Sequence, residues 1–288
     1  MLPTPAGPTG GQRSGPARPT RVLITNDDGV GAPGLGALAA AAVLLGFEVV
    51  IAAPSSDRSG SGAAIGPVSG SRLVDEVRVE LPGLGPTNGF AVGAPPALAV
   101  LLAAQGAFGT PPKIVLSGIN RGLNTGLAVL HSGTVGAAVT AANLGLRSLA
   151  VSMATGSPAH LDTAGVLAGC ALVRLRRAPA GTALNLNVPN LAIDDVRGLR
   201  WAPLAGFGSV RAVEQGAGDG AQVELRTNPV DVEPGTDTAL VAEGFATVTS
   251  VVGIRAAAAG PDLGKSPGCS PSHSQPDRGI LPLSATEQ

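Results

Sequence analysis

Residues 21–31 read RVLITNDDGVG, and this stretch decides how the rest of the chain is interpreted. The run 21–25 lacks the alternation of a half-exposed strand, which is typical of a strand buried on both faces of a parallel sheet. It leads directly into Asn26, two adjacent aspartates and a glycine. Adjacent carboxylates repel each other, and their removal from water is costly unless something compensates. The stretch is therefore either an ordinary turn or a place where a cation binds.

The same kind of strand recurs along the chain, with helical patterns between the strands. Further strands are predicted at 48–53, 113–117, 148–153 and 183–188, and helices at 33–46, 95–105, 132–144 and 160–176. Repeated strand–helix–strand order predicts an α/β fold with a mostly parallel sheet and helices on both faces. After residue 190, short strand patterns at 221–226 and 245–251 among Gly- and Pro-rich loops predict a smaller β-rich part.

The ends of the chain differ in composition from its middle. We expect a disordered leader at 1–19, a core at 20–190, a β-rich part at 191–255 and a disordered tail at 256–288. The leader lacks the apolar segment of a signal peptide. The most apolar stretch, 34–54, is interrupted by glycine and glutamate, which favours a helix and a buried strand over a membrane span.

Composition excludes several classes of protein. The net charge of −1 argues against a polyanionic partner such as a nucleic-acid duplex. The two cysteines, Cys170 and Cys269, have no metal-binding spacing and cannot form a disulfide framework, so we expect a reduced cytoplasmic compartment. The chain has no phosphate-loop motif and no GxSxG motif, and Pro33 interrupts the nearest dinucleotide-like glycine run.

Four polar segments follow predicted strands or open a predicted helix: 26–29, 54–64, 117–126 and 131–138. Each one alone has an ordinary explanation as a turn, a loop or a helix cap. Ligands of such sheets bind beyond the carboxyl ends of the strands, so we expect the segments to converge there. Together they offer two carboxylates, a hydroxyl and an amide oxygen, which suits a hard cation such as Mg²⁺ or Mn²⁺.

The segment 131–138, HSGTVGAA, is suited to bind an anion. A helix start built from small residues exposes backbone N–H groups and a partial positive charge. Ser132 and Thr134 add hydroxyl groups, and Gly133 allows close approach. A cation opposite an anion-binding helix end is an arrangement for phosphoryl chemistry, and the cation would neutralise the paired aspartates.

These motifs, in this order, resemble the SurE family of metal-dependent 5′/3′-nucleotidases, also called survival proteins. The resemblance covers roughly residues 20–190 and, more loosely, 235–251. It rests on ITNDDG at 24–29, SGINRG at 117–122, HSGTVGAA at 131–138, LNLNVP at 184–189 and GTD at 235–237. It implies a Rossmann-like α/β core, hydrolysis of nucleoside monophosphates, and a homodimer or homotetramer in which a C-terminal element is swapped and the part at 191–255 takes part.

The resemblance also implies which residues carry the chemistry. The metal ligands are Asp27, Asp28, Ser59 and Asn120. Asp27 and Asp28 are the catalytic candidates, and the nucleophile is either a metal-bound water or an aspartate. The phosphate-binding candidates are Asn26, Ser132, Gly133 and Thr134.

The chain departs from the family pattern at three alanines. Ala63 stands in a Gly-His-Ser position, and Ala94 and Ala97 fall within a Gly-Thr-Pro-Ala-Asp position. An acidic residue before the helix start is also missing, because 127–130 reads LAVL. Two alternatives therefore accompany the nucleotidase prediction. One is a nucleotide-binding or regulatory protein with weak activity, and the other is a phosphatase for a specialised phosphorylated metabolite.

Overall fold

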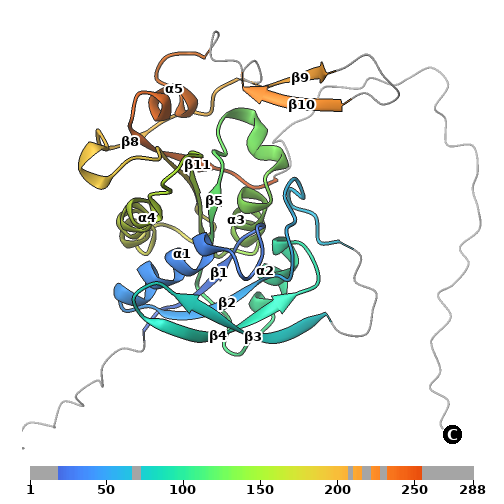
Figure 1. Cartoon of the computed structure of the whole chain (residues 1–288). Helices are drawn as coiled ribbons and strands as arrows, with labels where there is room; N and C mark the ends of the chain where they lie inside the picture. Colours follow the sequence, from blue (N-terminus) through green and yellow to red (C-terminus); the bar gives the residue numbers. More distant parts are fainter. Residues whose placement is uncertain (1–18, 67–72, 207–209, 216–221, 228–231, 255–288) are drawn as a thin grey trace, which may run out of the picture. The chain divides into compact units, whose positions relative to one another are not determined.

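The computed structural model describes residues 19–66, 73–206, 210–215, 222–227 and 232–254, and Figure 1 shows how their elements are arranged. The predicted tail and all but the last residue of the predicted leader lie outside the described residues. In the part of the chain that is described, no helix is both long and apolar enough to cross a membrane. The apolar stretch at 34–54 is instead most of a helix followed by a strand, as predicted.

A nine-stranded sheet forms the centre of the fold, in the order β3-β4-β2-β1-β5-β6-β7-β11-β8. All neighbours from β4 to β7 are parallel, while β3 and β11 run antiparallel to β4 and β7. The prediction of a mostly parallel sheet is confirmed. The strands are β1 (Arg21–Thr25), β2 (Glu48–Pro54), β3 (Val74–Leu81), β4 (Gly85–Val92), β5 (Ile114–Arg121), β6 (Arg147–Met153), β7 (Ala183–Val188), β8 (Leu199–Trp201) and β11 (Ala246–Val251).

Helices cover both faces of this sheet, as predicted. On β1, Val22 and Ile24 pack in one apolar cluster with helices α1 and α4, whereas Leu23 packs in a second cluster with α2 and α3. Alternate residues of a strand point to opposite faces, so β1 is buried on both sides. The helices are α1 (Pro33–Leu44), α2 (Pro96–Ala104), α3 (Gly133–Asn143) and α4 (Leu161–Leu175).

The hairpin of β3 and β4 was not predicted. Its strands pair from Val74 with Val92 to Leu81 with Gly85, and β4 then joins β2 in parallel. The outer strand β3 is largely exposed, so it lacks the apolar run that marks the buried strands. Pro86 and Gly89 in β4 weaken its strand pattern further.

The part after residue 190 contains strands, as expected, and it also continues the main sheet. β11 pairs antiparallel with β7, and β8 pairs parallel with β11. Strands β9 (Val210–Gln215) and β10 (Gln222–Thr227) form a separate antiparallel hairpin. The short helix α5 (Asp237–Ala242) was not predicted. Two 3₁₀ helices, η1 (Gly126–His131) and η2 (Ile193–Asp195), complete the described elements.

Candidate active site

The turn after β1 is held together by its own asparagine. The side-chain amide of Asn26 donates from Nδ2 to the Gly29 carbonyl at 3.0 Å and accepts at Oδ1 from the Gly29 N–H at 3.2 Å. Gly29 has φ +105°, a conformation that favours glycine. Asn26 is fully buried, and its two hydrogen bonds to Gly29 fix the turn that contains Asp27 and Asp28. Its predicted contact with phosphate stays a prediction.

The side chain of Asp27, which follows β1, contacts the first turn of α3. This side chain is 4 % exposed, and its Oδ1 accepts a hydrogen bond from the Thr134 hydroxyl. Burial raises the pKa of Asp27 above its ordinary value, while hydrogen bonds from the Thr134 hydroxyl and backbone oppose the rise. The structure therefore brings together the first predicted loop and the predicted anion-binding helix end, with Thr134 as the link.

Asp28 is half-buried beside this carboxylate. Burial and then the charge of Asp27 raise the pKa of Asp28 to about 6, with a smaller contribution from Asp57. Arg121, at the end of β5, acts in the opposite direction. The charges of Asp27 and Asp57 thus disfavour the ionised form of Asp28, the Arg121 guanidinium offsets part of this effect, and a bound cation would relieve the repulsion further.

The second loop contacts the first through its backbone. The Arg58 N–H donates to the Asp27 carbonyl at 2.7 Å. Ser59, a predicted metal ligand, is exposed, and its hydroxyl donates to Asp57 Oδ1 at 2.6 Å. These bonds from Ser59 lower the pKa of Asp57. The structure therefore places the Ser59 loop against the aspartates but directs the hydroxyl to Asp57, and a metal contact of Ser59 stays a prediction.

The third loop continues β5 beyond its pairing with β1. Asn120 Nδ2 donates to the Gly122 carbonyl at 2.8 Å, which fixes the side of the amide that carries Oδ1, the atom a cation needs. The pairing of β5 with β6 is irregular between Ser117 and Asn120. The neighbouring Arg121 is close enough to lower the pKa of Asp28. Asn120 therefore belongs to the same edge of the sheet, and its predicted role as a ligand stays a prediction.

Two glycines let the loops close on α3. A Cβ on Gly133 would lie 2.7 Å from both Asp27 Oδ2 and Ser61 Oγ, and a Cβ on Gly136 would lie 2.2 Å from the Gly62 carbonyl oxygen. A side chain at either position would force its neighbours to shift, and at Gly136 the neighbour is the backbone of Gly62. Ser132 caps the helix, because its Oγ accepts from the Val135 N–H at 3.1 Å.

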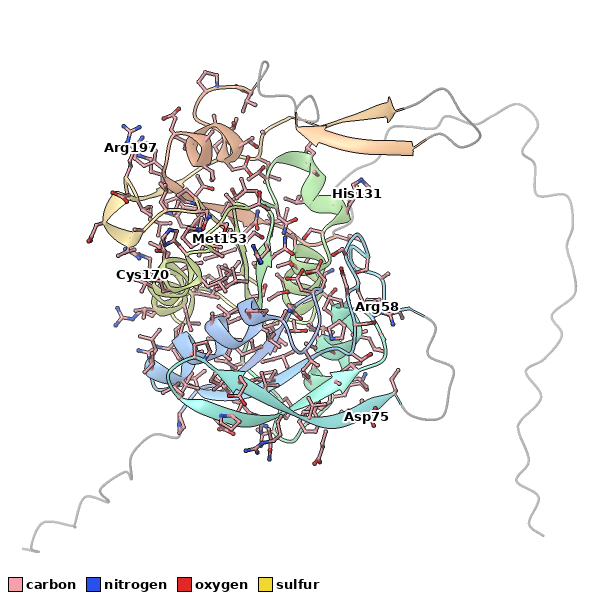
Figure 2. The ribbon with its side chains drawn as sticks, viewed as in Figure 1. Arg58, Asp75, His131, Met153, Cys170 and Arg197 are labelled. Carbon is pink, nitrogen blue, oxygen red and sulfur yellow. The ribbon has the colours of Figure 1, made fainter. Side chains whose placement is uncertain are left out.

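The second loop is also tied to the helix that precedes α3. The Gly62 N–H donates to the His131 carbonyl at 3.2 Å, where η1 ends. Figure 2 shows Arg58 and His131 on these two segments, on the same side of the molecule. The first, second and fourth predicted loops therefore meet at the start of α3.

A buried polar network supports the loop between β5 and η1, and sequence reasoning assigned it no role. Asn124 donates to Ser152 at 2.7 Å and bonds to Asn185 and Asn187 of β7. The carboxylate of Asp237, fully buried, accepts from the N–H groups of Gly126 at 3.0 Å and Ala205 at 2.9 Å. The motif LNLNVP contains Asn185 and Asn187, and GTD contains Asp237, but neither motif showed that these side chains support the loop.

The side chains at this edge of the sheet determine which ligands a metal ion could have. Among the described residues, no three histidine, cysteine, aspartate or glutamate side chains gather closely enough to hold a metal ion. A cation here needs neutral oxygens in addition to the carboxylates of Asp27 and Asp28. The predicted set, with one hydroxyl and one amide oxygen, has that composition and suits Mg²⁺ or Mn²⁺.

Comparison with known proteins identifies the family of this chain. Residues 22–208 match the family model of the survival protein SurE. The chain belongs to the SurE family. Among the curated SurE relatives, the 5′-nucleotidase SurE of Methylococcus capsulatus is 36% identical over 235 residues, which cover 79% of this chain and 89% of the relative. The 5′-nucleotidase SurE of Pseudomonas entomophila is 34% identical over 80% of this chain and 90% of its own length.

A solved SurE structure has the same fold. The crystal structure of the SurE protein from Aquifex aeolicus superposes with a TM-score of 0.66 at 27% sequence identity, covering 81% of this chain and 93% of that chain. The Rossmann-like α/β architecture predicted from the sequence is thereby confirmed.

Proposed function

We propose that this chain is a 5′-nucleotidase, a metal-dependent phosphomonoesterase that converts nucleoside monophosphates to nucleoside and phosphate. The observation that carries the proposal is the contact between the Asp27 carboxylate and Thr134 at the start of α3. It joins the acidic turn to a helix end suited to bind phosphate. The relatives named 5′-nucleotidase SurE support the same reaction.

The proposed metal ligands are Asp27, Asp28, Ser59 and Asn120. For Ser59 to contact a cation, the oxygen of its hydroxyl has to bind the cation, either while the hydroxyl still donates to Asp57 or after that hydrogen bond breaks. Either change is small, because Ser59 lies in an exposed loop. When bound, a divalent ion neutralises phosphoryl charge and favours the deprotonation of a water.

The chain's own groups bind and orient the phosphate ester. The backbone N–H group of Gly133 at the first turn of α3 is the first proposed phosphoryl donor, with Thr134, Ser132 and Asn26 as further candidates. In the reaction, a water oxygen bonds to phosphorus as the ester P–O bond breaks, one proton leaves the water, and the alcohol gains one. We assign the uptake of the first proton to Asp28, the more exposed of the paired carboxylates.

Of the three alanines that depart from the family pattern, two are buried. Ala94 is 3% exposed and belongs to the apolar cluster around α2, and Ala97 is fully buried in α2 itself. Ala63 is exposed in the loop that packs on α3 and is the departure that bears on substrate choice. It favours, as a second candidate, a phosphatase for a specialised phosphorylated metabolite.

The proposal is tested by a screen of purified protein against nucleoside monophosphates and other phosphate esters, with Mg²⁺, Mn²⁺ or a chelator. We expect phosphate release from nucleoside monophosphates that requires the metal. Turnover of another ester alone would favour the second candidate. Turnover of no ester would leave a nucleotide-binding or regulatory protein and contradict the proposed enzyme.

We further propose that the chain forms a homodimer or homotetramer. Helices α1 and α4 frame an apolar groove of about 950 Å³ that contains none of the proposed site residues. Leu44, Val166 and Val173 on these helices are 73%, 55% and 45% exposed. An apolar surface of this kind often marks a protein interface. Light scattering after gel filtration measures the mass, and a monomer at micromolar concentration would contradict the proposal.

The proposed partners and location follow from the same observations. The ligand is a small phosphate ester, and neither a nucleic-acid duplex nor a membrane is proposed as a partner. A reduced cytoplasmic compartment is compatible with the free, exposed thiol of Cys170.

A further inference from the structure

We propose that Ser61 is an additional phosphate-binding residue, whose hydroxyl donates a hydrogen bond to a phosphoryl oxygen held at the start of α3. The inference rests on the proposed function and adds a side chain to its site. Neither the motifs nor the resemblance had singled out this serine.

The first observation is an unpaired hydroxyl. Within the described part of the chain, Ser61 Oγ is buried and has no hydrogen-bond partner. A buried hydroxyl without a partner is costly, and most such groups in proteins are paired. Ser59, two residues earlier in the same loop, shows the contrast, because its hydroxyl donates to Asp57 at 2.6 Å. The Ser61 hydroxyl is therefore a donor of this loop that has no protein partner, as is the buried Nε of Arg58.

The second observation is where this hydroxyl lies. A Cβ on Gly133 would be 2.7 Å from Ser61 Oγ and 2.7 Å from Asp27 Oδ2, so the two oxygens are at most twice 2.7 Å apart. Ser61 Oγ thus lies at Gly133, the first residue of α3, and a helix start is a favourable place for an anion. An uncharged donor is suited to this place, because it can approach a phosphoryl oxygen without disturbing the neighbouring carboxylate.

The third observation is that the backbone holds Ser61 in place. Gly60 and Gly62 on either side have φ of +78° and +53°. The Ser61 N–H donates to the Arg58 carbonyl at 3.1 Å, and its own carbonyl accepts from the Ala64 N–H at 3.0 Å. A donor that is already positioned loses little conformational entropy when the ligand binds, so it contributes more to affinity.

The test compares Ser61→Ala with Ser55→Ala, a control at an exposed serine of the same loop. Calorimetry with the full chain measures Mn²⁺ binding alone and then inorganic phosphate binding in the presence of Mn²⁺. We expect Ser61→Ala to weaken phosphate binding about ten- to hundred-fold, to raise KM for a nucleoside monophosphate similarly, and to leave Mn²⁺ affinity within about twofold. Ser55→Ala should change neither.

A second pair of variants distinguishes loss of the hydroxyl from a general folding defect. Ser61→Thr and Ser61→Val have nearly the same shape and differ in the hydroxyl. We expect phosphate binding to be retained by Ser61→Thr and lost by Ser61→Val. Equal phosphate binding in this pair, or in Ser61→Ala and wild type, would overturn the inference, as would an equal loss of Mn²⁺ binding.

The binding and turnover measurements separate this inference from the proposed function. Wild-type protein that binds phosphate through Ser61 but hydrolyses no ester would contradict the proposed enzyme and support the inference. Normal turnover with unchanged phosphate binding in Ser61→Ala would overturn the inference alone. Wild-type protein that binds no phosphate with Mn²⁺ present would overturn the inference directly.

Discussion

Replacing Asp28 with asparagine should stabilise the metal-free protein at neutral pH, although it removes a proposed metal ligand. Burial and the charge of Asp27 raise the pKa of Asp28 from 3.8 to about 6 in the folded state. The folded protein therefore disfavours the ionised form of this side chain. Asparagine has a similar shape and carries no charge, so the variant avoids that cost.

The sign and size follow from the linkage between protonation and folding. A carboxyl whose pKa is raised on folding reduces stability as the pH rises from its unfolded pKa, near 3.8, to its folded pKa, about 6, and the loss is complete above that. A shift of about two units corresponds to about 3 kcal/mol at most. Asp28 is partly exposed, so solvent screening reduces the expected gain for the variant to about 1–2 kcal/mol.

Denaturant unfolding of both proteins in a chelator, at pH 4, 5, 6 and 7.5, measures this difference. We expect a small difference at pH 4 that grows through pH 6 and then stays constant. Addition of Mn²⁺ should reverse the order by stabilising the wild type more. A variant that is less stable than wild type at pH 7.5 without metal, or a difference that does not depend on pH, would refute the reasoning.

Three further predictions concern the start of α3 and its support. Thr134→Val removes the hydrogen bond to Asp27, so kcat/KM should fall about tenfold or more and the pKa of Asp27 should rise further. Unchanged turnover and an unchanged pH profile would contradict this prediction. Gly133→Ala inserts a Cβ 2.7 Å from the Asp27 carboxylate, so activity and thermal stability should both fall, and a fully active variant would contradict the close packing seen here. Asp237→Ala leaves the Gly126 N–H without its buried acceptor and should lower the free energy of unfolding by about 1–3 kcal/mol in denaturant titrations, whereas an unchanged midpoint would contradict the role of this carboxylate.

The buried part of the fold could be predicted because its signals are local. The strand at 21–25 and the helix starting at Pro33 are marked by apolar runs, proline and glycine within a few residues. The β3–β4 hairpin is exposed on its outer strand and carries no such run. The antiparallel pairing of β11 with β7 joins segments about 60 residues apart, and no local pattern encodes it.

The same distinction applies to the site. Motifs located the loops, because glycines and adjacent aspartates are unusual at strand ends. They did not show which atoms bond: Ser59 donates to Asp57, and Thr134 donates to Asp27. Ser61 Oγ can lie next to the start of α3 only because Gly133 has no side chain. This contact is a property of packing, and sequence spacing does not reveal it.

Phosphate release from nucleoside monophosphates by wild type and Asp27→Asn, with Mn²⁺ or Mg²⁺ and again after exhaustive chelation, tests the central claim most directly. Wild type should release phosphate in the presence of metal and lose this activity on chelation. Asp27→Asn should be slower by orders of magnitude while remaining folded, because it removes one of the two charges that would hold the cation. Full turnover after chelation, or full turnover by Asp27→Asn, would contradict the account.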